Sequence, residues 1–134
     1  MTGSNVREMM RRDRASAALG MVVEQDEPGH AVVTMRVRDD MLNGFAITHG
    51  GLVFALADTA FALACNEDDR VTVAAGADIT FLKSTTAGQT LTATATRRIV
   101  RGRTGLYDVT VTDEAGDTVA EFRGRSVATT RTAP

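Results

Sequence analysis

The residue with the clearest chemical potential in this sequence is Asp58, an acid inside an almost wholly apolar segment from Leu52 to Asn66. An ionised carboxylate without a partner in apolar surroundings costs several kcal/mol, about as much as the burial of two or three leucine or phenylalanine side chains contributes. Asp58 therefore has a specific partner or takes part in a reaction. In a reaction, burial would raise the pKa of its carboxyl group and strengthen it as a base.

Backbone N–H groups at the start of this segment offer a second kind of chemistry. His49, Gly50 and Gly51 precede the apolar run. The first N–H groups of a helix have no acceptor within it, and the helix dipole places partial positive charge there. Glycine lets a ligand approach the backbone closely, and a donor fixed at a forming oxyanion is worth about 3 kcal/mol. Taken alone, however, the glycine pair is better explained as the turn into the helix.

The spacing of Gly51 and Asp58 connects the two features. Seven positions place both residues on nearly the same face of a helix, but roughly 10 Å apart along its axis. One substrate carbonyl cannot easily contact both within a single chain. Two helices packed antiparallel across a twofold axis would bring Gly51 of one copy opposite Asp58 of the other and create two identical sites. The spacing thus predicts a homodimer whose monomeric variants are inactive.

The elements that must position these residues form a single domain of the α+β class. The stretch from Val6 to Ala18 is typical of a short amphipathic helix on the surface, and it gives an N-terminal arm over residues 1–19 in front of a domain over residues 20–134. The run from Leu52 to Asn66 lacks period-2 alternation and predicts a central helix buried on nearly every side.

Strands are expected before and after this helix, with glycine-bearing turns that make the later ones antiparallel. The expected strands are residues 21–25, 31–37, 71–82, 90–96, 106–112 and 119–129. A strand pair, one long apolar helix and four further strands indicate an antiparallel sheet wrapped around the helix, which is the hotdog arrangement.

Composition restricts the possible partners. A net charge of -2 over 134 residues gives no electrostatic reason to expect nucleic acid. The apolar run is shorter than the roughly 20 residues that span a bilayer, and no signal region is visible, so we expect a cytoplasmic protein with no membrane partner. Two histidines and one cysteine do not compose a zinc site, so we expect no metal. Cys65 is expected to be a small core residue, not a nucleophile.

Three linked motifs resemble one known family. Leu42-Asn43-Gly44, then His49-Gly50-Gly51, then the stretch from Phe54 to Phe61 are similar to the PaaI-type phenylacetyl-CoA thioesterases of the hotdog superfamily. The likeness continues into the later strands and covers nearly the whole chain beyond the arm. Two positions depart from the family pattern. Lys83-Ser84-Thr85 stands where many relatives have a proline and a tighter loop, and Val127 stands where a close relative often has histidine.

This resemblance implies hydrolysis of an acyl-CoA thioester, with phenylacetyl or hydroxyphenylacetyl as the acyl group. Asp58 would act as a general base for water, which we favour, or as a nucleophile. The Gly51 N–H would polarise the thioester carbonyl, while Asn43 and His49 orient the site. No cofactor is expected, since CoA is part of the substrate, and the homodimers are expected to form a homotetramer. Substrate contacts are expected at Leu42, Phe54 and Thr59, although aromatic residues on a central helix more often belong to the core.

CoA is strongly anionic, so its binding site needs cations. Arg101 and Arg103 flank Gly102 in a predicted hairpin turn and are the expected CoA contacts. Lys83 is a third expected contact, because its segment lies where the nucleotide end of CoA would run. The alternative is a solvated basic edge that deters pairing with other strands.

Two other classes of protein remain open. A hotdog dehydratase acting on acyl carriers would use a histidine with an acid, and His49 lies at the helix start and not at the position of a base. A non-catalytic acyl-CoA-binding module would bind without turnover and would usually carry an output domain, for which we expect no room in this chain.

Overall fold

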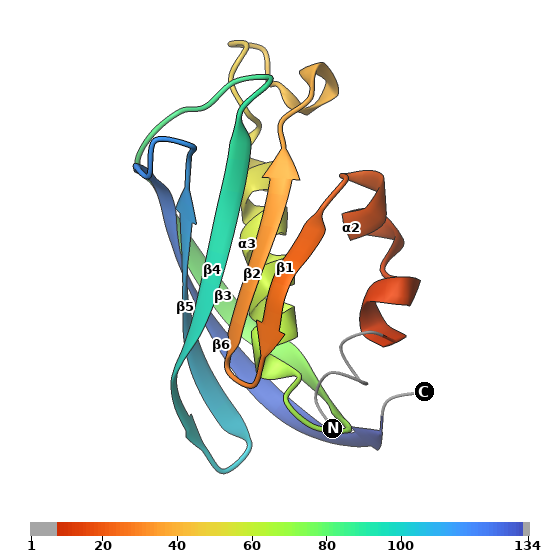
Figure 1. The fold of residues 1–134 in the computed structure, drawn as a ribbon. Helices are drawn as coiled ribbons and strands as arrows, with labels where there is room; N and C mark the ends of the chain where they lie inside the picture. Colours follow the sequence, from red (N-terminus) through yellow and green to blue (C-terminus); the bar gives the residue numbers. More distant parts are fainter. Residues whose placement is uncertain (1–7, 133–134) are drawn as a thin grey trace.

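The computed structural model describes residues 8–132, which form one antiparallel sheet around a long helix (Figure 1). The sheet has six strands in the order β1-β2-β4-β5-β6-β3, and each neighbouring pair is antiparallel. The strands are β1 Val22–Glu27, β2 His30–Arg36, β3 Arg70–Phe81, β4 Thr90–Arg101, β5 Thr104–Thr112 and β6 Thr118–Thr132. All six match strands that the sequence predicts, so the expected hotdog architecture is confirmed.

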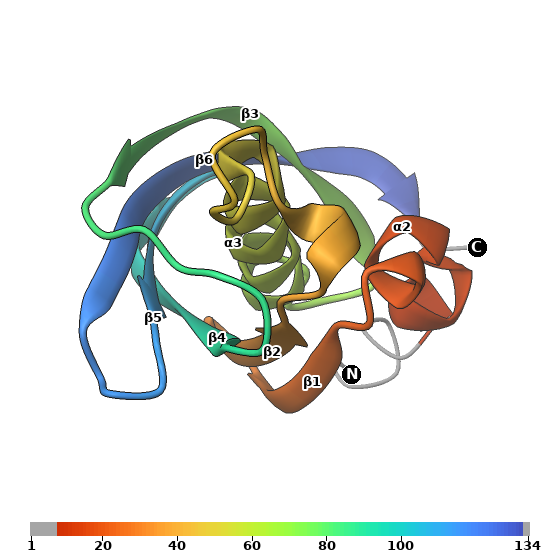
Figure 2. The same cartoon turned by 90° about the horizontal axis from the view of Figure 1, so that it is seen from above.

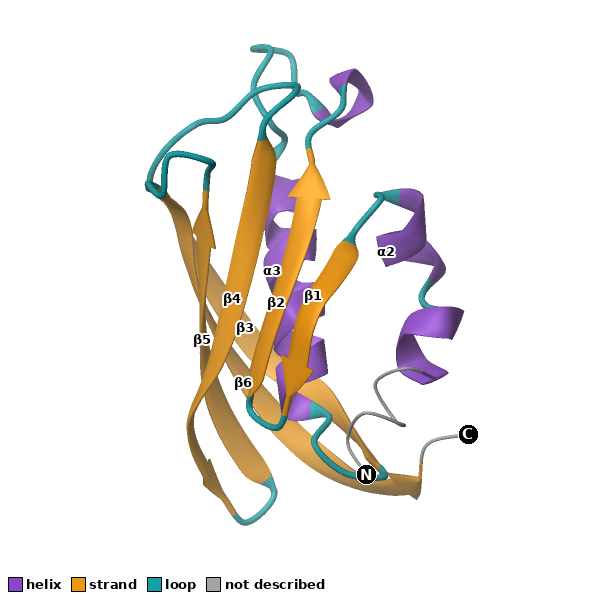
Figure 3. Cartoon of the chain, viewed as in Figure 1, coloured by secondary structure: helices purple, strands orange, loops and turns teal. Residues whose placement is uncertain are grey.

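The long helix, α3 (Gly50–Cys65), runs through the middle of the curled sheet (Figure 2). Figure 3 shows that the other helical segments are short: residues 8–12, α2 (Arg14–Ala18) and the 3₁₀ helix η1 (Asp39–Met41). Within residues 8–132, no helix combines the length and the apolar character needed to cross a membrane.

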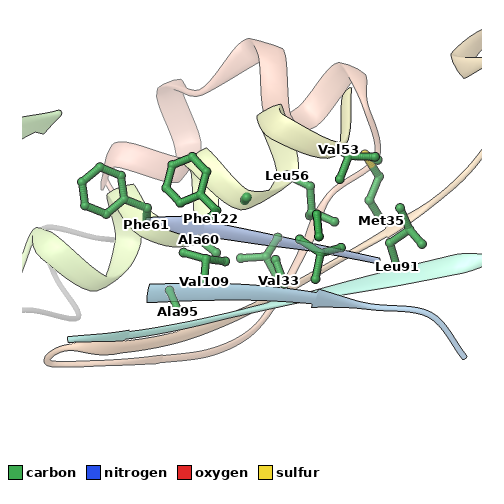
Figure 4. Close-up of a cluster of buried hydrophobic side chains, with 14 of the residues drawn as sticks. Val33, Met35, Val53, Leu56, Ala60, Phe61, Leu91, Ala95, Val109 and Phe122 are labelled. Carbon is green, nitrogen blue, oxygen red and sulfur yellow. The ribbon is translucent and has the colours of Figure 1, made fainter. Parts of the chain in front are cut away.

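The core lies between α3 and the concave face of the sheet (Figure 4). Because side chains alternate along a strand, every second residue of β2, β4 and β5 points at the helix. Leu56, Ala60 and Phe61 of α3 are buried against them. Buried strand residues include Val33, Met35, Leu91, Ala95 and Val109. Two of these residues, Ala60 and Ala95, are alanines, which let the helix lie close to the strands.

Both ends of α3 are fixed by side-chain caps. His49 is the N-cap, and its side chain accepts a hydrogen bond from the N–H of Gly51. At the other end, the Asn66 amide donates to the Ala62 carbonyl (2.7 Å) and accepts from the Thr72 N–H (3.0 Å). These caps set where the helix begins and ends, and therefore the position of Asp58 between them.

One face of α3 is not covered by the sheet, contrary to the expectation that the helix is buried on nearly every side. Gly51 is exposed, and Ala55, Asp58 and Ala62 are only half-buried. Their spacing of three to four residues places them on one stripe of the helix. Three of the four are glycine or alanine, so the uncovered stripe is nearly flat around Asp58.

The N-terminal arm lies against the domain as two short helices, where one short amphipathic surface helix is expected. Residues 1–7 of the arm, including Val6, lie outside the described residues, and residues 8–18 form two short helices separated by Asp13, the N-cap of α2. Figure 2 shows these helices on the side of α3 that the sheet leaves open. Ser16 is only 3% exposed.

The hairpin between β4 and β5 extends beyond the core. We expect a strand over residues 90–96, but β4 continues to Arg101. Consecutive arginines at positions 97 and 98 give no apolar alternation, because residues 96–101 of β4 are exposed on both faces of the strand. Gly102 forms the tip with a φ of 62°, a conformation that favours glycine.

Candidate active site

Asp58 lies on the wall of an apolar cavity with a volume of about 470 Å³. Phe61, Ala62 and Cys65 of α3 line it beside Asp58, while Met9 and Asp13 contribute from the arm. The carboxyl group has no hydrogen bond or ion pair within residues 8–132. Desolvation by burial, reinforced by the negative charge of Asp13, raises the pKa of Asp58. An acid with a raised pKa and no neutralising partner is the pattern of a group available for proton transfer.

Gly51 lies at the start of α3 on the same stripe as Asp58. In this structure its N–H is occupied, because it donates to Nδ1 of His49 at 3.1 Å. Both residues are exposed, so a ligand oxygen can reach the N–H once the imidazole ring turns away. A side chain at position 51 would stand in this path, since a Cβ built there lies 3.3 Å from Nδ1 of His49.

Asn43 stabilises the loop that leads into α3. Its Oδ1 accepts from the N–H groups of Phe45 (2.8 Å) and Ile47 (3.4 Å). Its backbone carbonyl accepts from the N–H of Ala46, a non-glycine residue at a positive φ of 62°, where the backbone is strained. Only the amide NH₂ of Asn43 remains available, since none of the described residues accepts a hydrogen bond from it. Asn43 therefore orients the loop through its Oδ1. Its NH₂ group is the part of the side chain that is left to donate a hydrogen bond to a ligand.

A single chain does not bring all of these residues together. Asn43 and Gly50 line a second cavity of about 350 Å³ with Phe81 and Leu82, and Asp58 does not belong to it. The expected separation of Gly51 from Asp58 along the helix thus persists in the structure.

The three residues expected to contact substrate occupy three different environments. Leu42 is half-buried and forms an isolated bridge with Thr48. Phe54 is half-buried and its ring lies 5.2 Å from that of Phe122, edge to face. Thr59 is buried, and its hydroxyl lies 2.9 Å from the Ser16 hydroxyl. None of the three lines either of the two cavities described above.

The three cations expected to contact CoA do not form one group. Lys83 binds Asp113 (2.6 Å) and Asp117 (2.7 Å), so two carboxylates already neutralise its charge. Arg101 and Arg103 lie at the opposite end of β5, a strand of nine residues that spans roughly 30 Å. Arg103 donates from Nε to the Ala128 carbonyl. Arg101 has no hydrogen bond or ion pair with the described residues.

Comparisons with known proteins agree with this fold. Residues 45–120 match the model of the thioesterase superfamily, a range that includes Gly51 and Asp58. The acyl-coenzyme A thioesterase PaaI of Escherichia coli is 46% identical over 122 residues, which are 91% of this chain and 87% of the relative. The chain belongs to the thioesterase superfamily.

Solved structures of superfamily members support the assignment. The structure of the E. coli PaaI protein from the phenylacetic acid degradation operon superposes with a TM-score of 0.94 at 44% identity, over 98% of this chain and 95% of that one. A hypothetical thioesterase from Streptococcus pneumoniae, crystallised with coenzyme A, gives a TM-score of 0.85 at 26% identity, over 93% and 98% of the two chains. A thioesterase-superfamily hotdog fold is therefore shown for nearly the whole chain.

Two other kinds of chemistry would need a reactive cysteine or a metal site. Burial raises the pKa of Cys65 to about 12, so its thiol stays protonated and is a poor nucleophile. No cluster of three histidine, cysteine, aspartate or glutamate side chains in the described part of the chain is placed to hold a metal ion.

The arm contributes two polar residues beside the site that the sequence analysis missed, Asp13 and Ser16. Asp13 followed by Ser16 three positions later is a recognisable start of a helix. No local pattern reveals that Ser16 meets Thr59, which is 43 positions away in the chain.

Proposed function

We propose that the protein hydrolyses arylacetyl-CoA thioesters, such as phenylacetyl-CoA, to the free acid and CoA. The observation that carries this proposal is Asp58, an unpaired acid with a raised pKa on a cavity wall, seven residues from the N–H of Gly51 at the helix start. The relatedness to an acyl-coenzyme A thioesterase supports the substrate class. Phenylacetyl is favoured because the structural match is a protein of a phenylacetic acid degradation operon.

In the proposed reaction Asp58 removes a proton from water, and the resulting hydroxide attacks the thioester carbonyl carbon. The carbonyl oxygen becomes an oxyanion that the Gly51 N–H stabilises, which is the largest expected contribution to catalysis. The tetrahedral intermediate then breaks its C–S bond and releases the CoA thiolate, which takes up the proton held by Asp58. No cofactor enters this sequence, since CoA leaves as a product.

The proposed site forms between two copies of the chain. The uncovered stripe of Gly51, Ala55, Asp58 and Ala62 supports an antiparallel helix pair, because small side chains allow close approach. In such a pair Gly51 of one subunit lies opposite Asp58 of the partner subunit, and the twofold axis creates two equal sites. Two such dimers would form the proposed homotetramer.

The experiment that tests the proposal replaces Asp58 by Asn and measures steady-state hydrolysis of phenylacetyl-CoA. We expect kcat to fall by about two orders of magnitude or more with little change in KM, because the lost group acts in the transition state. Asp26→Asn is the matched control, since Asp26 is an exposed carboxylate on β1. An Asp58→Asn enzyme with the wild-type rate would refute the proposed mechanism.

A second measurement separates the base from the nucleophile. In one turnover with excess enzyme in ¹⁸O-labelled water, a general base places labelled oxygen directly in the product acid. Unlabelled acid in that first turnover would mean that a carboxylate oxygen of Asp58 attacked the thioester and was transferred to the product.

A further inference from the structure

The N-terminal arm reaches the candidate site through one buried polar contact. The arm lies on the side of α3 that the sheet leaves open (Figure 2), and Ser16 is its buried polar residue. The Ser16 Oγ lies 2.9 Å from the Oγ1 of Thr59. Thr59 directly follows Asp58 in α3, so this contact joins the arm to the residue beside the proposed base.

The direction of these hydrogen bonds follows from counting protons. The Ser16 hydroxyl donates to Oδ2 of Asp13 at 2.7 Å, and the Ser16 N–H donates to Oδ1 of the same carboxylate at 2.9 Å. A hydroxyl has one proton, so Ser16 has none left for Thr59. Thr59 must therefore donate to Ser16, and the order is Thr59 to Ser16 to Asp13.

Asp13 also shares a cavity with Asp58, because both carboxylates line the same space of about 470 Å³. The other ionisable side chains on this cavity are Glu8, Arg12, Cys65 and Arg131. Glu8 forms an ion pair with Arg12 at 3.5 Å, and Cys65 is a neutral thiol. Of these groups, Asp13 is the one whose charge acts on the pKa of Asp58, and it raises that pKa in addition to the effect of burial.

We propose that Asp13 and Ser16 are positioning residues of the thioesterase site: the Thr59–Ser16–Asp13 chain holds the arm against α3 and fixes a second carboxylate on the cavity wall that carries Asp58. This inference rests on the proposed function, in which Asp58 is the base. A fixed negative charge near a base strengthens its hold on a proton and moves its working range to higher pH.

The first test replaces Asp13 by Asn and measures kcat/KM for phenylacetyl-CoA against pH. Asparagine caps a helix about as well as aspartate, so α2 is retained while the charge is lost. We expect the acid limb of the profile to move to lower pH by roughly half a unit, the size expected for one partly screened charge. The Asp26→Asn control should give the wild-type profile. An unshifted acid limb in Asp13→Asn would overturn the inference.

The second test asks whether Ser16 acts through Thr59. Ser16→Ala keeps the charge of Asp13 but breaks the chain, and we expect kcat to fall about fivefold, the effect of one ordinary hydrogen bond. In a Thr59→Val background the same Ser16→Ala change should have no further effect, because the hydrogen bond is already absent. Equal effects in both backgrounds would show that Ser16 does not act through Thr59 and would overturn this part of the inference.

The Asp58→Asn enzyme separates failure of this inference from failure of the proposed function. If Asp58→Asn is inactive and Asp13→Asn keeps the wild-type pH profile, the thioesterase mechanism stands and the role of Asp13 is refuted. If Asp58→Asn retains the wild-type rate, both proposals fall.

Discussion

The N–H of Gly51 has two competing acceptors in the proposed catalytic cycle. In the structure it donates to Nδ1 of His49, and in the proposed mechanism it donates to the substrate carbonyl. One N–H binds a single acceptor with good geometry, so substrate must displace the imidazole ring. His49 is exposed, which leaves its ring free to rotate. His49 is therefore an N-cap of the free protein, and we propose that it orients the substrate after its ring has moved.

This cap makes a testable contribution to stability. His49→Ala removes the acceptor for the Gly51 N–H, and loss of an N-cap costs about 1 kcal/mol. We expect the free energy of unfolding in urea to fall by that amount for His49→Ala and to recover for His49→Asn, because asparagine is a good N-cap. Identical urea midpoints for the three proteins would show that the cap contributes nothing. Activity provides a separate test, since His49→Asn restores the cap but not an imidazole that orients the substrate.

Gly124 on β6 faces the ring of Phe61 on the helix that carries Asp58. A Cβ built at Gly124 lies 2.8 Å from three ring atoms of Phe61, closer than real side-chain contacts. We expect Gly124→Ala to destabilise the fold by about 1–3 kcal/mol through overpacking, measured by urea unfolding. Gly44→Ala is the matched control, since an added Cβ there meets nothing within 4 Å. Phe61→Leu should relieve part of the Gly124→Ala loss, and strictly additive losses would contradict steric conflict with this ring.

At the scale of elements, the cations of the β4–β5 hairpin and of the loop after β3 differ in how free they are to bind a phosphate group. Lys83 is held by two aspartates, whereas Arg101 has no ion pair among the described residues. An antiparallel dimer would bring the hairpin of one subunit toward the Gly51 end of the partner's helix, because the hairpin lies near the C-terminal end of α3.

These positions predict different effects on CoA binding. We expect Arg101→Ala to raise KM for phenylacetyl-CoA several-fold at low salt, because one phosphate contact is lost. A phenylacetyl thioester of a small thiol without the nucleotide should keep its KM. Lys83→Met should leave KM unchanged for both phenylacetyl-CoA and the small thioester. It should lower the melting temperature at neutral pH, since the pKa of Asp113 is lowered chiefly by its hydrogen bond to Lys83. That stabilisation exists above the usual carboxyl pKa and disappears as the pH falls through the lowered pKa. If Lys83→Met alone raised KM, the assignment would be reversed.

Some features of the helices and strands can be predicted from the sequence, and others cannot. The bounds of α3 and the core parts of the strands follow from local patterns, because burial on one side imposes a period on Leu91, Ala93 and Ala95. The far half of β4 escapes detection because both of its faces are exposed. Likewise, Asp58 and Gly51 can be chosen from residue type and spacing. The partners of Lys83 and Thr59 lie 30 or more positions away, and only the folded chain shows them.

At the scale of the whole molecule, two surfaces are only partly covered by the rest of the described chain. One is the small-residue stripe of α3 that carries Gly51 and Asp58. The other is β3, an edge strand of the sheet with exposed Val73, Ala74 and Ala75. Exposed edge strands pair readily with other strands unless they are protected. The proposed antiparallel helix pair would cover the stripe of α3, so the proposed site depends on this association.

Subunit mixing tests whether each site uses residues from two chains. Asp58→Asn lacks the base, and Gly51→Pro lacks the N–H at a first-turn position where proline is tolerated. If Gly51 of one subunit works with Asp58 of the partner subunit, a heterodimer of these two inactive proteins has one intact site and one doubly altered site. Half of randomly formed dimers are mixed, so co-expression in equal amounts should recover about a quarter of the wild-type activity per subunit. Circular dichroism spectra of both variants check that they fold. If each site lay within one chain, every site in the mixture would carry one of the two changes. Activity equal to the sum of the separate variants would therefore refute the shared site.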